Sequence, residues 1–249
     1  MRLHLEALIL LANRMRPCLI ILGLFNVLAS IGHMAEDPKP FVPTGNYTTT
    51  NLVGWTVRVN KRLLAEERTP GSNALQLLAS KLREITNSLP QRAREKLRAV
   101  PIWLGVDDGH APCSEYHPSK QWLTEHGFNP DKARCVEIGN ARRFIDWSRS
   151  QPSMVLHELA HAYHHQVLGF DYPPIKKAFE SAVQSGIYDK VKRENGKTVR
   201  AYALNDPQEY FAEGTEAFFG RNDFYPFTRD ELKQHDPALF SILEEVWNR

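Results

Sequence analysis

The five residues His157-Glu158-Leu159-Ala160-His161 constrain this chain more than any other part of its sequence. In an α-helix, His157 and His161 lie one turn apart, about 6 Å along the axis, and face the same side. Two imidazole nitrogens placed in this way can bind one Zn²⁺ at about 2.0–2.1 Å. Glu158 lies beside them and can reach a water on the metal without being a ligand itself. The motif therefore predicts a zinc site with an adjacent carboxylate base, provided that the segment is helical.

The sequence around the motif favours such a helix. Pro152 suits its first turn, and Gly169 suits its end. Apolar residues cover one broad arc between these two positions, and the motif's histidines and glutamate occupy the opposite arc. This pattern predicts a helix that packs in the core while lining a cleft. The alternative is a partly exposed helix with solvated histidines.

Two histidines leave the zinc ion short of a protein ligand. The extended metzincin pattern requires Gly at position 164 and His at position 167, where this chain has His164 and Val167. His164 also lies about 10 Å along the helix from the first motif histidine, too far to share the metal. His165 points further round the helix. Both extra histidines are therefore expected in the cleft wall or on the surface.

A carboxylate from a second helix is the better third ligand. Residues 205–220 begin with Asn, Asp and Pro and end at Gly, which predicts a helix. Glu209, Glu213 and Glu216 share one face of it, and aromatic and small residues cover the rest. Stacked carboxylates repel one another unless a cation or buried donors compensate, and zinc on the facing helix would do so. Spacing alone leaves all three glutamates open as ligands, with a solvated acidic stripe as the alternative.

These residues resemble the zincin metallopeptidases that use glutamate as the third zinc ligand, the gluzincin-like enzymes. The register of Tyr202, Asn205, Glu209 and Glu213, with Tyr-Phe-Ala between the two glutamates, is most similar to the catalytic domain of anthrax lethal factor and to the Pro-Pro endopeptidases. The similarity spans roughly residues 150–220. It implies one Zn²⁺ bound by His157, His161 and Glu209.

The same resemblance implies roles for three further residues. Glu158 is the general base, Tyr202 supplies the hydroxyl that stabilises the oxyanion, and Glu213 accepts a hydrogen bond from a ligand histidine. The expected fold is α/β (α+β) and zincin-like, with a small N-terminal mixed sheet, a central motif helix and a helical C-terminal part. The expected activity is hydrolysis of internal bonds in a peptide or protein substrate. The alternative is a non-catalytic zinc- or partner-binding module on this fold.

The first 35 residues have the features of a secretory signal peptide. A basic start and a 15-residue apolar run, residues 17–31, precede small residues near position 35. The run is shorter than the roughly 20 residues of a membrane-spanning helix, so no stable span is expected after cleavage. We therefore expect a secreted, periplasmic or cell-envelope protein, with an uncleaved anchor as the alternative. Met15 is a second candidate start, and the sequence does not define the cleavage site.

Removal of this leader changes the charge and the cysteine count. The chain has 31 basic and 29 acidic residues, and the leader holds three arginines and one glutamate, so the remainder is formally neutral. A neutral protein is not expected to bind nucleic acid. The remainder contains only Cys113 and Cys135, which are predicted to form a disulfide, with two buried thiols as the alternative.

The remainder is predicted to start with a Pro- and Thr-rich linker over residues 36–52, followed by one domain over residues 53–249. Residues 55–60, 100–106 and 133–138 are predicted strands, and residues 73–89 a helix. An extended peptide substrate is expected to add as a strand beside residues 135–138.

Overall fold

The computed structural model describes residues 40–107 and 113–249. The predicted signal peptide, residues 1–35, lies outside these residues. Within the described part, no helix has the length and apolar character that a membrane crossing requires.

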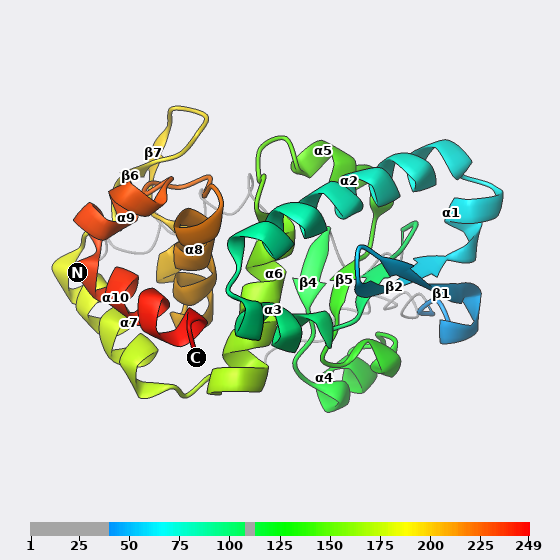
Figure 1. Ribbon diagram of the computed structural model, residues 1–249, viewed down its shortest axis with the longest axis horizontal. Coiled ribbons are helices and arrows are strands. Elements are labelled where there is room, and N and C mark those ends of the chain that lie inside the picture. Colours follow the sequence, from blue (N-terminus) through cyan, green and yellow to red (C-terminus); the bar gives the residue numbers. More distant parts are fainter. Residues whose placement is uncertain (1–39, 108–112) are drawn as a thin grey trace, which may run out of the picture. The chain divides into compact units, whose positions relative to one another are not determined.

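Strands and helices alternate in the first half of the described chain, and helices dominate the second (Figure 1). The strands are β1 (Tyr47–Leu52), β2 (Trp55–Asn60), β3 (Ile102–Leu104), β4 (Ser114–Tyr116), β5 (Val136–Ile138), β6 (Val191–Lys192) and β7 (Thr198–Val199). The α-helices are α1 (Lys61–Ala65), α2 (Arg68–Ser88), α3 (Gln91–Arg98), α4 (Lys120–Glu125), α5 (Ala141–Trp147), α6 (Met154–Tyr163), α7 (Pro173–Ser185), α8 (Pro207–Phe219), α9 (Arg229–His235) and α10 (Pro237–Trp247). Short 3₁₀ segments are η1 (Thr44–Asn46), η2 (Pro130–Lys132) and η4 (Tyr202–Leu204), and η3 (His164–Leu168) is a π-helix.

The folded part begins earlier than the sequence predicts. The linker prediction over residues 36–52 is wrong for its second half, because β1 pairs with β2 along its whole length. Its run of β-branched threonines favours a strand. The turn between the two strands places Val53 and Gly54 at φ 56° and 84°, the left-handed conformation that tight hairpins require.

The sheet is mixed, with strand order β1-β2-β3-β5-β4. β2, β3 and β5 run parallel, whereas β1 and β4 are antiparallel to their neighbours. β5 is therefore paired on both sides, so the prediction that a peptide adds beside residues 135–138 is wrong. The edge nearest the motif helix is β4, a strand that sequence reasoning missed because its three residues, Ser-Glu-Tyr, contain no run of β-branched or aliphatic residues.

The helices bury one face of this sheet. Ile102, Leu104, Val136 and Ile138 point into the main core and have no exposed surface. The intervening Trp103 packs into a smaller cluster on the opposite face, as the alternation of side chains along a strand requires. Helix α6 lies against β4 and β5, so the sheet supports the helix that carries the motif.

Charged side chains are buried on the opposite face of the sheet. Glu137 of β5 is 1% exposed and contacts Lys132 Nζ and His117 Nε2, the latter at 2.7 Å. Burial alone would raise the pKa of Glu137, but the hydrogen bond from His117 and the charge of Lys132 lower it to about 2. The carboxylate is therefore charged in the folded protein far below pH 4.5, its ordinary pKa.

This difference predicts a specific loss of stability in acid. Above pH 4.5, Glu137 is charged in both the folded and the unfolded state, and its contacts contribute fully to the stability. Between pH 4.5 and about 2, the unfolded chain binds the proton while the folded protein does not, so this contribution to the stability falls as the pH falls. We expect Glu137→Gln to lower the free energy of unfolding at pH 7 by about 3–5 kcal/mol, because Lys132 remains buried without its counter-charge. The variant should also lose less stability than the native protein between pH 5 and 3.

Urea unfolding at pH 7, 5 and 3 measures both effects. The exposed Glu95→Gln is the control and should follow the native protein at each pH. Parallel pH profiles for the native protein and Glu137→Gln would contradict the role given to this carboxylate.

The predicted disulfide does not form. Cys113 and Cys135 are both free and buried. Cys113 is paired with Gly139 across the β4–β5 ladder, four residues from Cys135. At about 3.3 Å per residue, the two cysteines lie about 13 Å apart along the strand, beyond the roughly 7 Å between Cα atoms that a disulfide can bridge. Cys113 Sγ instead lies 3.5 Å from Met154 Sδ.

The C-terminal helices enclose α8. Its residues from Glu209 to Phe218 are all buried, and α6, α7, α9 and α10 pack around it. Gly214 allows the closest approach, because a Cβ there would lie 2.5 Å from the side chain of Leu239. The prediction of an α+β fold, with a small mixed sheet, a central motif helix and a helical C-terminal part, is confirmed (Figure 1).

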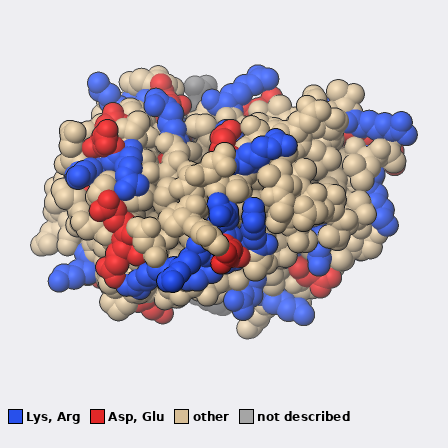
Figure 2. All heavy atoms as spheres, in the orientation of Figure 1, with Lys and Arg blue, Asp and Glu red and all other residues tan. Residues whose placement is uncertain are grey.

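Charges of both signs are interspersed on the face that Figure 2 shows. The small net charge of the sequence is therefore accompanied by a mixture of positive and negative side chains on that face.

Candidate metal centre

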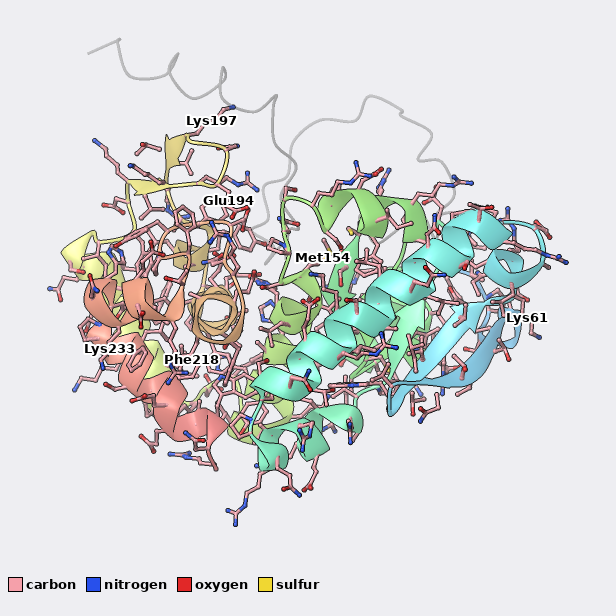
Figure 3. The ribbon with its side chains drawn as sticks, turned by 45° about the horizontal axis from the view of Figure 1, so that its top comes forward. Lys61, Met154, Glu194, Lys197, Phe218 and Lys233 are labelled. Atoms are coloured by element: carbon pink, nitrogen blue, oxygen red, sulfur yellow. The ribbon has the colours of Figure 1, made fainter. Side chains whose placement is uncertain are left out.

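The candidate metal centre lies between α6 and α8, which run side by side (Figure 1). Met154 is the first residue of α6, and Phe218 lies in the last turn of α8 (Figure 3). Asp206 caps the start of α8, accepting hydrogen bonds of 2.9 Å from the amides of Gln208 and Glu209. The cap fixes the first turn of α8, and this turn carries Glu209 towards the motif histidines.

Three ligand atoms converge between the two helices. His157 Nε2 lies 3.1 Å from His161 Nε2 and 3.0 Å from Glu209 Oε2, and the third side, from His161 Nε2 to Glu209 Oε2, is 3.5 Å. We call these three atoms the ligand triangle. Zinc bonds of about 2.0–2.1 Å at tetrahedral angles place ligand atoms about 3.3–3.4 Å apart. The triangle therefore has the size of one face of a zinc coordination tetrahedron.

The remaining nitrogen of His157 contacts Glu216. Nδ1 lies 2.7 Å from Glu216 Oε1. This hydrogen bond places a proton on Nδ1 and leaves the lone pair of Nε2 directed into the ligand triangle. The sequence assigned this contact to Glu213, and the structure differs: Glu216, two helical turns after Glu209, occupies the position. The row of glutamates on one face of α8 was the sequence signal for this contact, but their spacing did not indicate which of them contacts His157.

Glu213 lies deeper in the protein. It is 4% exposed, and its Oε2 has no hydrogen-bond partner among the described residues. Burial, followed by the charge of Glu216, raises the pKa of Glu213, and burial also raises the pKa of Glu216. Asp223, a third buried acid nearby, is paired with Arg193 at 2.8 Å. The raised pKa values show that burial and mutual repulsion disfavour the charged forms of these acids, and a bound cation would relieve that repulsion.

The electrostatics of the triangle also favour a cation. Burial alone would lower the pKa of His157, but hydrogen bonds with Glu209 and Glu216 raise it well above its ordinary value. Burial alone would raise the pKa of Glu209, but the charge of His161 and a hydrogen bond with His157 lower it strongly. The site thus attracts positive charge, and a metal ion competes with the proton for the same nitrogen.

A second group of potential ligands exists among the described residues. His157, Glu213 and Glu216 also place one ligand atom each within 4.8 Å of the others. This group offers only one imidazole, whose Nδ1 already binds Glu216. The ligand triangle offers two imidazoles and a carboxylate, the donor set typical of catalytic zinc sites.

The other two predicted residues lie close to the triangle. The hydroxyl of Tyr202 donates to Glu209 Oε1 at 3.3 Å, and its ring centre is 6.4 Å from that of His157. Glu158 is 8% exposed and follows His157 on α6. Direct contacts therefore join four of the five residues predicted for zinc and catalysis, and Glu158 is next to His157 in the sequence. Tyr202 joins this group although it lies 41 positions after His161.

The extra histidines lie away from the triangle. His164 is fully buried between the rings of Phe170 and Phe211, so the expectation of a cleft-wall or surface position does not hold for it. Burial lowers the pKa of His164 to about 3 and keeps it neutral. His165 is partly exposed and contacts Tyr116 of β4.

Comparison with known proteins gives one family match. A family model described as glucose-regulated metallo-peptidase M90 matches residues 138–248, which include α6, α8 and the whole triangle. The part of the chain that holds the metal centre is similar to a metallopeptidase family. Among solved structures, the Pro-Pro endopeptidase of Paenibacillus alvei is 18% identical, with 72% of this chain and 90% of that chain covered at a TM-score of 0.38, which does not establish a common fold. No curated protein matches the chain.

The contact between Glu216 and His157 predicts a measurable effect on metal affinity. We expect Glu216→Gln to weaken zinc binding about 10- to 100-fold, because the amide holds His157 less firmly and does not increase the basicity of its Nε2. Competition with a chromogenic chelator measures the dissociation constant. The exposed Glu180→Gln on α7 is the control, and equal zinc affinity in both variants would refute the contribution of Glu216.

Proposed function

We propose that this chain is a zinc-dependent peptidase in which His157, His161 and Glu209 bind the metal. The ligand triangle is the observation that carries the proposal, because its three sides match one face of a zinc tetrahedron. The similarity of residues 138–248 to a metallopeptidase family supports it independently.

The roles of the surrounding side chains follow from their positions. A bound Zn²⁺ supplies Lewis acidity, which polarises a peptide carbonyl and lowers the pKa of a water to about 7. Glu158 accepts the proton of the attacking water and passes it to the leaving amine. Tyr202 turns its hydroxyl from Glu209 towards the negative charge that develops on the peptide oxygen. Glu216 holds His157 in one tautomer throughout.

The substrate side of the proposal rests on the outer edge of β4, which pairs with no other strand in the described part of the chain. Cys113 and His117 make the ladder hydrogen bonds to β5. In an antiparallel ladder every second residue bonds to the same neighbour, so Ser114 and Tyr116 direct their backbone N–H and C=O groups away from β5. An extended peptide can therefore add there as a strand, beside the helix that carries the motif. A substrate held along its backbone on both sides of the cleaved bond favours endopeptidase activity.

We also propose, from the sequence, that the protein is exported from the cytoplasm. The apolar leader over residues 1–35 supports export, which places the substrate outside the cytoplasm or in the cell envelope. A fusion of these residues to a reporter that is active only after export tests this point. Reporter activity that stays in the cytoplasm would contradict it.

Zinc analysis combined with a peptide-library cleavage assay tests the function. We expect about one zinc ion per chain, bound at the triangle, and cleavage that stops with a chelator and returns with zinc. Internal cleavage products would establish an endopeptidase. Bound zinc without chelator-sensitive cleavage across the library would favour the non-catalytic binding module.

Tyr202 provides a second test of the mechanism. We expect Tyr202→Phe to lower kcat about 10²-fold or more, because one donor to the oxyanion is lost, while the zinc content stays unchanged. Steady-state kinetics and metal analysis on the same preparation separate the two effects. Unchanged turnover would remove Tyr202 from the mechanism, and zinc loss would indicate that it acts by supporting Glu209.

A further inference from the structure

The side chain of Tyr116 joins the edge strand β4 to the continuation of the metal-binding helix. Its hydroxyl lies 2.7 Å from His165 Nδ1 and accepts a 3.0 Å hydrogen bond from Gln166 Nε2. His165 and Gln166 belong to η3, which follows α6 without a break. Tyr116 is 8% exposed, so these hydrogen bonds are shielded from competing water. The contact spans 49 residues of sequence and joins two elements that border the proposed cleft.

The Tyr116 hydroxyl takes part in two hydrogen bonds in this cluster. The amide nitrogen of Gln166 can only donate, so the hydroxyl accepts from it. When the His165 proton is on Nε2, the hydroxyl donates its own proton to His165 Nδ1. Gln166 Nε2 also donates to the carbonyl of Arg134 at 3.2 Å. Arg134 has φ 60°, and its amide donates to the carbonyl of His117. One glutamine thus holds both the end of β4 and the start of β5.

The backbone and the side chain of Tyr116 therefore have separate roles. Its backbone groups face the free edge, where the proposed peptide adds. Its side chain extends to η3 and fixes the strand relative to the helix that carries the zinc ligands. β4 also pairs with β5 and packs against α6, and the Tyr116 side chain adds directional hydrogen bonds to these contacts. It therefore contributes to setting the distance between the peptide-binding edge and the metal centre.

We propose that Tyr116, His165 and Gln166 are positioning residues that hold the peptide-binding edge at its working distance from the metal centre. We call these three residues the edge clamp. The proposal rests on the proposed peptidase function, and no member of the clamp touches the reacting atoms. The clamp acts on substrate binding through β4, so it affects KM more than kcat.

Removal of one hydroxyl isolates this contribution. We expect Tyr116→Phe to raise KM about fivefold, with kcat within about twofold of the native value, because the ring still packs but both hydrogen bonds are lost. His165→Leu removes the acceptor and should have a similar effect. His165→Asn places an oxygen near the former Nδ1 position, so it should restore KM to within about twofold of the native value.

The experiment uses a fluorescent peptide chosen from those that the native protein cleaves. Its KM and kcat are measured for each variant, and its dissociation constant is measured by anisotropy in proteins that also carry Glu158→Gln, which removes cleavage from the readout. Zinc content and melting temperature are determined on the same preparations. Tyr172→Phe is the control, because the partly exposed Tyr172 hydroxyl accepts a hydrogen bond from Arg249 near the surface and has no other hydrogen bond within the described residues.

The outcomes separate this inference from the function on which it rests. A raised KM and weaker peptide binding with native zinc content, reversed in His165→Asn, support the edge clamp. Unchanged KM and peptide affinity in Tyr116→Phe, or a loss confined to kcat, overturn it while leaving the peptidase intact. A native protein that cleaves no peptide in a chelator-sensitive way refutes the peptidase function, and the edge clamp with it.

Discussion

Glu158→Gln should bind zinc as the native protein does and lose peptide cleavage by about 10³-fold or more. The substitution keeps the shape of a side chain that is 8% exposed, so packing around α6 is preserved. It removes the carboxylate that follows the first motif histidine on α6 and that, in the proposed mechanism, accepts a proton from water. General bases contribute about 10²–10⁴-fold, and here the same group also returns the proton to the leaving amine, so the loss should lie in the upper part of that range.

Cleavage of the library-derived peptide and zinc content, both measured on one preparation, check this expectation. Glu180→Gln is the matched control, because it makes the same chemical change on the exposed face of α7. Cleavage near the native rate in zinc-loaded Glu158→Gln would remove Glu158 from the mechanism. Loss of zinc would instead assign it a structural role at the metal centre.

Glu209→Gln should have the second largest effect, the loss of the metal itself. Its carboxylate contributes two sides of the ligand triangle, at 3.0 and 3.5 Å from the histidine nitrogens. An amide oxygen carries no net charge, so the variant keeps two imidazoles and loses the anionic ligand. We expect zinc affinity to fall by more than the roughly 10- to 100-fold that an outer hydrogen-bond partner contributes, with cleavage lost in parallel.

Zinc competition and cleavage at increasing zinc concentration test the effect. Gln208→Ala, on the residue before Glu209 in α8, is the control and should retain both properties. Native affinity in Glu209→Gln would refute the assignment. In that case Glu213 and Glu216, the alternatives that spacing left open, would be tested by the same substitution.

The motif and its two helices are predictable from the sequence because they depend on local rules. The 3.6-residue period, the caps at Asp206 and Pro207 and the stop near Gly220 define α8 without tertiary information. The same spacing places the histidines of α6 on one side. Each of these predictions follows from residues within one helix and its caps.

What the sequence missed depends on contacts between distant elements. β4 has three residues and no periodic signal, and its place beside β5 appears only once the chain is folded. Glu216 contacts His157, and Glu213 does not, because of the angle between α6 and α8. The spacing of residues in the sequence carries no information about that angle. The disulfide prediction failed because an even number of cysteines carries no information about the register of the strands that hold them.

The ligand triangle combines two histidines of α6 with Glu209 of α8, which lies 52 positions after His157 in the sequence. An unfolded chain holds only the local histidine pair, so it binds zinc much more weakly than the native protein. Mass action then makes zinc a stabiliser of the native state, adding about 4 kcal/mol when free zinc exceeds the dissociation constant a thousandfold. If the proposed zinc site is correct, metal supply therefore affects the stability of the folded molecule as well as its chemistry, and we expect the zinc-free protein to unfold more readily than the zinc-loaded one.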